Sequence, residues 1–253
     1  MKAVRFLADL LWPPRCPLCD RVVGFAETCP ECGRDSVQLL RRQQPAVPGP
    51  GRAMDFLDGA FAAFWYEPPV QDAIVRMKQN GRSDIAAWCA GEMLLALERA
   101  GGPVVDLVVP VPAGRTQMRR RGRFDGPRYM AKILAGGLGA ALCTDILYKA
   151  FDTPPQHLLS ARDRRSNLLG AFAVCPRRAA QLAGKRVLLA DDVFTTGATL
   201  NECAKMLRAA GAAECWGVCT ALARTPRERD GGKADMGEAA LPDGVGGKGA
   251  AEG

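Results

Sequence analysis

The sequence predicts an α/β protein in which a parallel sheet is flanked by helices. Short runs of branched and leucine side chains, typical of buried strands, recur along the chain and alternate with segments of helical periodicity. The helical segments are bounded by residues that begin or end helices, such as proline at the start and glycine past the end. This alternation favours a parallel sheet with helices on both faces.

The predicted elements follow in a regular order. A strand covers 59–66, and Pro69 opens a helix that runs through Met77 and ends near Asn80-Gly81. The next elements are expected to be helix 83–99, strand 104–109, helix 127–136, the apolar strand from Val187 to Asp191, helix 198–210 and strand 214–222.

The strand that begins at Val187 leads into an unusually polar loop. Its residues are Asp191, Asp192, Val193, Phe194, Thr195, Thr196, Gly197, Ala198 and Thr199. Small side chains from Thr195 to Thr199 allow backbone N–H groups to surround an anion, and the following helix directs the positive end of its dipole to the same point. A phosphate monoester fits there.

The paired carboxylates indicate what carries that phosphate. They would repel it, so they are expected to accept hydrogen bonds from neighbouring hydroxyls or to hold water around a divalent metal. Phosphate, hydroxyls and metal together indicate a phosphorylated ribose. The alternative is a polar loop in which Thr196 or Thr199 caps a helix, but capping needs only one such residue. A Walker-type loop is excluded because no Gly-Lys-Ser/Thr ending is present.

Length and composition set outer limits. The 253 residues suffice for one sizeable α/β core with something small attached, and 48% hydrophobic with 24% charged residues is ordinary for a soluble globular chain. The formal charge of +7 favours anionic partners, either nucleic acid, phosphorylated metabolites or a membrane face. His157 is the single histidine, so a multi-histidine metal site and a Ser-His triad are excluded.

The N-terminal segment 1–12 is apolar but interrupted by Arg5 and Asp9, and no small-residue cleavage site follows it. It is interpreted as a short amphipathic helix packed on its own protein rather than a signal peptide, with membrane contact as the minor alternative. No apolar run of spanning length occurs elsewhere, so a cytoplasmic location is expected.

Four of the ten cysteines form two Cys-x-x-Cys pairs separated by nine residues, namely Cys16, Cys19, Cys29 and Cys32. This spacing suits one tetrahedral Zn²⁺ of structural type, in knuckles where a following glycine such as Gly33 takes a positive φ. A disulfide pair would need an oxidising compartment, and a redox pair would need only one motif. The other six cysteines are expected to be core residues.

Composition also predicts the domain boundaries. The proline- and glycine-rich stretch 43–54 is expected to be a linker between an N-terminal helix with a zinc ribbon, 1–42, and the α/β domain, 55–224. The glycine-rich tail 225–253 lacks apolar periodicity and is expected to be disordered.

Two basic segments lie where loops from strand ends could converge on the phosphates. Segment 115–124 contains Arg120 and Arg121, and segment 156–167 contains Arg164. Their arginines could bind pyrophosphate or a nucleic-acid backbone, with a solvated basic surface as the alternative. Lys78 is a weaker candidate for the same pocket.

These motifs resemble, in content and order, those of the ComF family. The resemblance is carried by the four cysteines, Tyr66-Glu67, Lys78, Val109-Pro110-Val111-Pro112, the arginine-rich segment, Gln156 with Arg164 and Asn167, Ala171-Phe172, and the Asp191–Thr199 loop. The loop itself matches the phosphoribosyl pyrophosphate (PRPP) loop of type I phosphoribosyltransferases. The family commonly has Asn-Gln after the aromatic residue of the arginine-rich segment, where this chain has Asp125-Gly126.

The resemblance implies a zinc ribbon joined to a phosphoribosyltransferase-like domain, and a cytoplasmic role in handling incoming single-stranded DNA during natural transformation. We expect a protein that binds a PRPP-type ligand with Mg²⁺ and contacts single-stranded DNA or DNA-uptake proteins. The alternative is an active Mg²⁺-dependent phosphoribosyltransferase with an unidentified acceptor, in which Arg120 and Arg121 neutralise the leaving pyrophosphate. A convincing acceptor-binding hood is not visible in the sequence, and a purely structural role ranks last.

Overall fold

The computed structural model describes residues 13–24, 28–33, 52, 54–114, 124–151 and 170–224. The chain divides into two units, Met1–Ala223 and Arg224–Gly253, and every described helix and strand lies in the first. The predicted N-terminal helix, most of the predicted linker and the predicted tail lie outside the described residues. None of the described helices combines the length and the apolar character that a membrane crossing requires.

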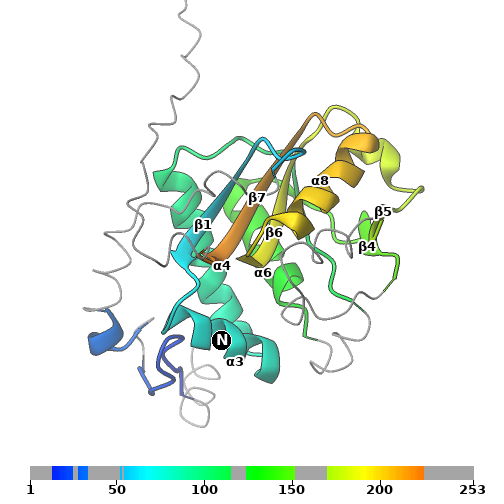
Figure 1. The fold of residues 1–253 in the computed structure, drawn as a ribbon. Coiled ribbons are helices and arrows are strands. Elements are labelled where there is room, and N and C mark those ends of the chain that lie inside the picture. Colours follow the sequence, from blue (N-terminus) through cyan, green and yellow to red (C-terminus); the bar gives the residue numbers. More distant parts are fainter. Residues whose placement is uncertain are drawn as a thin grey trace, which may run out of the picture. The chain divides into compact units, whose positions relative to one another are not determined.

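The centre of the first unit is a parallel sheet with the strand order β1-β7-β6-β2-β3 (Figure 1). Its strands are β1 (Gly59–Trp65), β2 (Leu107–Pro110), β3 (Ala141–Leu142), β6 (Arg186–Phe194) and β7 (Glu214–Leu222). All four neighbouring pairs are parallel, so the carboxyl ends of the strands meet at one edge. A separate antiparallel pair consists of β4 (Leu147–Lys149) and β5 (Phe172–Val174).

Helices cover both faces of the sheet. The helices are α3 (Val70–Asn80), α4 (Ser83–Arg99), α6 (Gly126–Leu138) and α8 (Ala198–Ala209), with a short 3-10 helix, η2 (Ala179–Leu182). Helices α4 and α6 contact each other and the strands from one side, whereas α8 contacts β5, β6 and β7 (Figure 1). The α/β class with a parallel sheet between helices is therefore confirmed.

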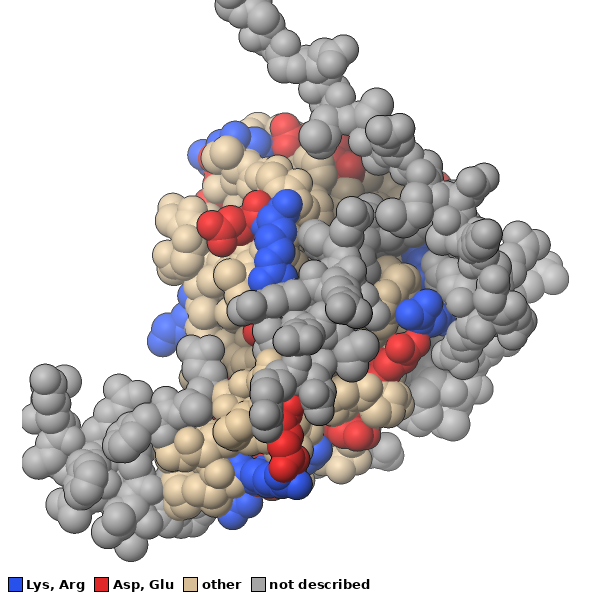
Figure 2. Space-filling view, turned by 90° about the vertical axis from the view of Figure 1, so that its left-hand side faces the viewer, with Lys and Arg blue, Asp and Glu red and all other residues tan. Residues whose placement is uncertain are grey.

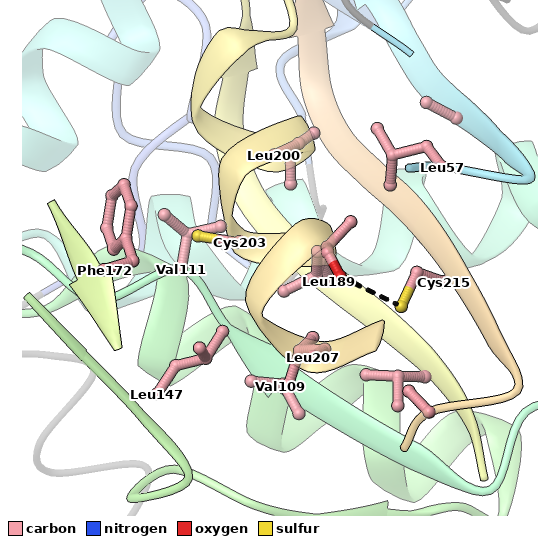
Figure 3. Close-up of a cluster of buried hydrophobic side chains, with 14 of the residues drawn as sticks. Leu57, Val109, Val111, Leu147, Phe172, Leu189, Leu200, Cys203, Leu207 and Cys215 are labelled. Carbon is pink, nitrogen blue, oxygen red and sulfur yellow. Dashed lines mark hydrogen bonds between the residues drawn. The ribbon is translucent and has the colours of Figure 1, made fainter. Parts of the chain in front are cut away.

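Two hydrophobic clusters, one on each face, explain why the strands have nearly continuous apolar sequences. Along β6, Val187 and Leu189 join the cluster under α8, and Leu188 and Ala190 join the cluster on the other face. Leucines and a cysteine of α8 point into the first cluster in Figure 3, where they meet residues of β2, β5 and β6. A strand that is buried on both faces has apolar residues at successive positions, so its sequence does not alternate between apolar and polar residues. This pattern is usual in parallel sheets.

Several boundaries differ from the sequence prediction. Strand β2 begins at Leu107 rather than 104, and Val104 is 72% exposed. Helix α6 is longer than 127–136 because Asp125 caps its start and Gly139, at φ 64°, ends it. Strand β6 continues through Phe194, past the two carboxylates. Strands β3, β4 and β5 and helix η2 were not predicted, since two to four residues carry too little periodicity.

Candidate functional site

The predicted loop lies at the carboxyl edge of the sheet. Asp191 pairs with Cys219 and Val193 with Ala221, so the carboxylates belong to the end of β6 and not to the loop after it. Successive side chains of a strand point to opposite sides. Asp191 and Asp192 therefore face different surroundings, and they do not form one chelating pair.

Asp192 forms an ion pair with Lys78. It is 8% exposed, and Lys78 Nζ, from the last turn of α3, donates to Asp192 Oδ1 at 2.6 Å. The two residues are 114 positions apart in the sequence. The structure thus brings two sequence-predicted candidates together, with the lysine compensating a largely buried carboxylate that would otherwise be costly to ionise.

Asp191 lies on the α8 side of the sheet. Its Oδ1 accepts a hydrogen bond from the backbone N–H of Asp192 at 2.8 Å. Burial raises the pKa of the Cys203 thiol on α8, and the negative charge of Asp191 raises it further, which indicates that this carboxylate is near α8. Asp191 is half-buried, so part of it is accessible to a ligand.

The loop leads directly from the end of β6 into the start of α8. Gly197 is the N-cap residue, in the left-handed region at φ 81°, and it offers no side chain to cap the helix. Within the described residues, Thr196 Oγ1 accepts from the N–H of Ala198 at a long 3.4 Å, and the first turn contains no acidic residue. Thr196 thus caps one N–H group weakly, which the alternative of a capping threonine predicted. The N–H groups at a helix start suit a phosphate.

Sequence reasoning missed Arg52, which it placed in the linker. Its guanidinium donates to the carbonyl oxygens of Thr195 and Ala223, the residues that follow β6 and β7. It also lies over the ring of Phe194, at 5.8 Å from the centroid. The proline- and glycine-rich surroundings of Arg52 carry no signal of this contact.

A second buried charge was also missed. Glu202 on α8 is 7% exposed and accepts from the backbone N–H of Gly170 at 2.9 Å, with Lys205 Nζ at 3.9 Å. A carboxylate in the middle of an amphipathic helix has no distinctive sequence signal.

The four predicted zinc ligands do come together. The Sγ atoms of Cys16, Cys19, Cys29 and Cys32 all lie within 4.8 Å of one another. This set is compatible with the tetrahedral four-thiolate coordination that zinc prefers. Burial acts to raise the pKa of the Cys16 thiol, but hydrogen bonds from backbone N–H groups outweigh it and lower that pKa to about 7. Burial raises the pKa of Cys19 and of Cys32, so four thiolates would form only with the charge of a metal among them.

The knuckle geometry corrects one expectation. Asp20, the residue after Cys19, takes the left-handed conformation at φ 65°, and Gly33 does not. Gly33 instead ends a helical turn, where its N–H donates to the carbonyl of Cys29 at 2.7 Å. A Cβ at Gly33 would lie 3.2 Å from Thr28 Oγ1, so space rather than φ favours glycine there.

The cysteine module, which contains Cys16, Cys19, Cys29 and Cys32, is held against α3 and against Arg82, the residue before α4. Arg76 Nη2 donates to the carbonyls of Pro17 and Leu18, each at 2.8 Å, and Arg82 Nη1 donates to Asp20 at 2.6 Å. Cys16, Leu18 and Cys29 also belong to the hydrophobic cluster that contains the buried face of α3. Helix α3 therefore contacts both the cysteine module and, through Lys78, the carboxyl edge of the sheet.

The unusual Asp125-Gly126 pair has a structural explanation. Asp125 is the N-cap of α6 and its side chain accepts from the N–H of Arg128 at 3.0 Å. Gly126 is buried, and a Cβ there would lie 3.1 Å from Met77 Cε of α3. Glycine at 126 therefore leaves room for Met77 of α3 beside the start of α6.

The basic segments cannot be placed. Arg120, Arg121 and Arg164 lie outside the described residues, and their suggested contacts with pyrophosphate or DNA stay predictions. On the face of the molecule drawn in Figure 2, basic and acidic side chains of the described part are interspersed rather than separated by sign.

Comparison with known proteins assigns the chain to a family. A family model described as the phosphoribosyl transferase domain matches residues 126–237. The DNA utilization protein YhgH of Salmonella typhi is 33% identical over 217 residues, which cover 82% of this chain and 90% of that protein. Competence protein F of Haemophilus influenzae is 36% identical over 162 residues, 62% of this chain and 70% of that protein.

Among solved structures, the allosteric regulatory enzyme of purine biosynthesis aligns with a TM-score of 0.34 and 26% identity. The match covers 53% of this chain and 25% of that enzyme chain, so the chain spans about a quarter of the length of that solved relative.

Proposed function

The chain belongs to the ComF family and contains a phosphoribosyltransferase-like domain, and from this premise we propose that it binds a PRPP-type ligand with Mg²⁺ at the Asp191–Thr199 loop. The observation that carries the proposal is the start of α8 at Gly197, an N-cap residue without a side chain, next to the carboxylates at the end of β6. The 5′-phosphate of the ligand would accept from the loop N–H groups of Thr195 to Thr199.

The carboxylates have separate roles in this proposal. Asp191 is partly accessible and would accept hydrogen bonds from the ribose hydroxyls. Asp192, held by Lys78, would contribute less directly, by keeping α3 in place beside the carboxyl edge of the sheet. Mg²⁺ would arrive with the diphosphate, whose charge it neutralises, and Asp191 is the carboxylate placed to bind its water shell.

Calorimetry with PRPP and Mg²⁺ tests the proposal. We expect binding heat for the natural sequence and its loss in an Asp191→Ala/Asp192→Ala variant. Asp145→Ala is the matched control, because Asp145 is an exposed carboxylate paired with Arg178 away from the loop. Equal heat in all three proteins would contradict the ligand assignment.

The biological role that we propose is the handling of single-stranded DNA during uptake in natural transformation, in the cytoplasm. The names of two relatives, DNA utilization protein and Competence protein F, support it, as does the net charge of +7. Affinity for a single-stranded oligonucleotide should fall steeply as salt rises, because bound phosphates release counterions. No binding at low salt would leave DNA-uptake proteins as the better partners.

The same loop also supports a second candidate, an active phosphoribosyltransferase. In that reaction the protein positions the ribose and neutralises the departing diphosphate, for which Arg120 and Arg121 are candidates. Release of diphosphate from PRPP that depends on an added acceptor would favour this function over binding alone.

We further propose that the four cysteines hold one structural Zn²⁺ within an N-terminal module, 1–42, followed by a linker, 43–54, the phosphoribosyltransferase-like domain, 55–224, and a disordered tail, 225–253. A Cys16→Ser protein should lose stoichiometric zinc on dialysis, whereas Cys175→Ser, outside the cluster, should retain it. Metal retained by both variants would contradict the site.

A further inference from the structure

The guanidinium of Arg52 joins the two strand ends next to the loop. One nitrogen donates to the carbonyl of Thr195 and the other donates to the carbonyl of Ala223 at 2.9 Å. The same group lies over the ring of Phe194, the last residue of β6. Arg52 thus contacts the first peptide group after β6, between Thr195 and Thr196, and joins it to the end of β7.

This contact determines where the next backbone N–H points. A trans peptide is planar, and its C=O and N–H groups point in opposite directions. Because Arg52 binds the carbonyl of Thr195, the N–H of Thr196 must point away from Arg52. A loop N–H whose direction is fixed in advance binds an anion with less loss of conformational entropy.

The chemistry of the contact requires arginine. Two carbonyls, on the residues that follow β6 and β7, are bound by two nitrogens of one planar group, whose central carbon lies 5.8 Å from the centre of the Phe194 ring. A lysine ammonium has no fork of this geometry. This position therefore distinguishes arginine from lysine, which makes the role testable by a conservative exchange.

We propose that Arg52 is a positioning residue for the phosphate-binding loop: it holds the Thr195–Thr196 peptide in the orientation that receives the ligand phosphate. The proposal rests on the proposed function of the loop. Arg52 itself is not expected to contact the ligand.

Arg208 provides a matched control. It also fixes the segment before β1, by donating to the carbonyl of Phe56 at 3.0 Å and to Asp58, and to the carbonyl of Ala213 at 2.9 Å. It lies in the last turn of α8, 11 residues and so roughly 16 Å along the helix axis from Gly197, given a rise of about 1.5 Å per residue. Arg208→Gln removes a similar clamp without touching the loop.

The experiment compares Arg52→Gln, Arg52→Lys and Arg208→Gln by two measurements. Hydrogen–deuterium exchange reports the protection of the amides of 195–198 and of Ala223, whose N–H donates to the carbonyl of Phe194 at 2.8 Å beside the Arg52 contacts, and calorimetry reports the affinity for PRPP with Mg²⁺. We expect Arg52→Gln to speed exchange in the loop and to weaken affinity about tenfold, as expected for the loss of one well-placed hydrogen bond. Arg52→Lys should recover little of either, and Arg208→Gln should change neither.

Unchanged loop exchange in Arg52→Gln would overturn the proposal, whether or not PRPP binds. Full recovery by lysine would overturn it as well, because charge alone would then suffice. If the natural sequence shows no heat with PRPP, the ligand assignment of the loop fails, and the exchange data still decide whether Arg52 orders the Thr195–Thr196 peptide.

Discussion

Charged residues have different surroundings at the two ends of the parallel strands. The amino ends of the strands form the amino edge of the sheet, and their carboxyl ends form the carboxyl edge. At the amino edge, Asp106 accepts three hydrogen bonds from Arg186, two from its guanidinium and one from its backbone N–H. At the carboxyl edge, Lys78 contacts a single oxygen of Asp192, and Gly197 leaves the start of α8 without a side-chain cap.

The difference distinguishes a carboxylate that stabilises the fold from a carboxylate that can contact a ligand. Asp106 accepts all three of these bonds from one partner, so it links the start of β2 to the start of β6. The carboxyl edge combines a half-buried carboxylate, a lysine and a helix start, and this is where α/β sheets bind ligands. Variants matched across the two edges can test this distinction.

The largest effect is expected for Lys78→Met. The substitution leaves the carboxylate of Asp192 largely buried without its cation, which should lower the free energy of unfolding by about 3 kcal/mol. Urea denaturation measures the loss. Lys132→Met, on the exposed face of α6, should cost less than about 0.5 kcal/mol.

Asp192→Asn in the Lys78→Met background should restore most of that stability, because the buried negative charge is then gone. No recovery in the double variant would mean that the packing of α3, and not the ion pair, explains the loss.

A glycine pair compares the edges at equal backbone strain. Gly197 and Gly139 are both in the left-handed region, at φ 81° and φ 64°, but Gly139 lies at the opposite edge, just before β3. Alanine at either position should destabilise by about 1 kcal/mol. Only Gly197→Ala should also weaken binding of PRPP with Mg²⁺ in calorimetry. Equal affinities in the two variants would remove Gly197 from the site.

The smallest effect is expected for Asp106→Asn, and it depends on pH. The hydrogen bonds from Arg186 lower the pKa of Asp106 to about 2. Because the folded-state pKa lies below the unfolded value, the stabilisation is present above about pH 4 and is lost as pH falls through about 2. The difference in denaturant midpoint between the natural sequence and Asp106→Asn should therefore disappear in acid. If Asp106→Asn altered the affinity for PRPP, a residue at the amino edge would also affect binding, which would contradict the distinction between the edges.

How much could be predicted from the sequence depended on how far apart the interacting residues are. The four cysteines lie within 17 positions, and their spacing alone predicted the cluster that the structure forms. The long helices and strands β1 and β7 were predicted nearly to their ends, because each carries its own period. The predicted loop was correct only in part, since Asp191 to Phe194 belong to β6.

Contacts between distant residues left no such signal. Arg52 reaches Thr195 across 143 positions from a stretch whose composition indicates a linker. The ion pair of Lys78 with Asp192 joins two candidates that the sequence offered separately. The extension of β6 through Asp192 was missed because pairing with β7, and not strand propensity, keeps these carboxylates in the sheet.

Helix α3 connects the cysteine module to the carboxyl edge of the sheet. Arg76 and Lys78 are two residues apart, which places them about 200° apart around the helix axis, given about 3.6 residues per turn. One contacts the cysteine module and the other contacts the end of β6. A rotation of this helix that draws Lys78 away from Asp192 must also move Arg76 relative to Pro17 and Leu18. The cysteine module and the carboxyl edge of the sheet are therefore linked through the rotation of one helix.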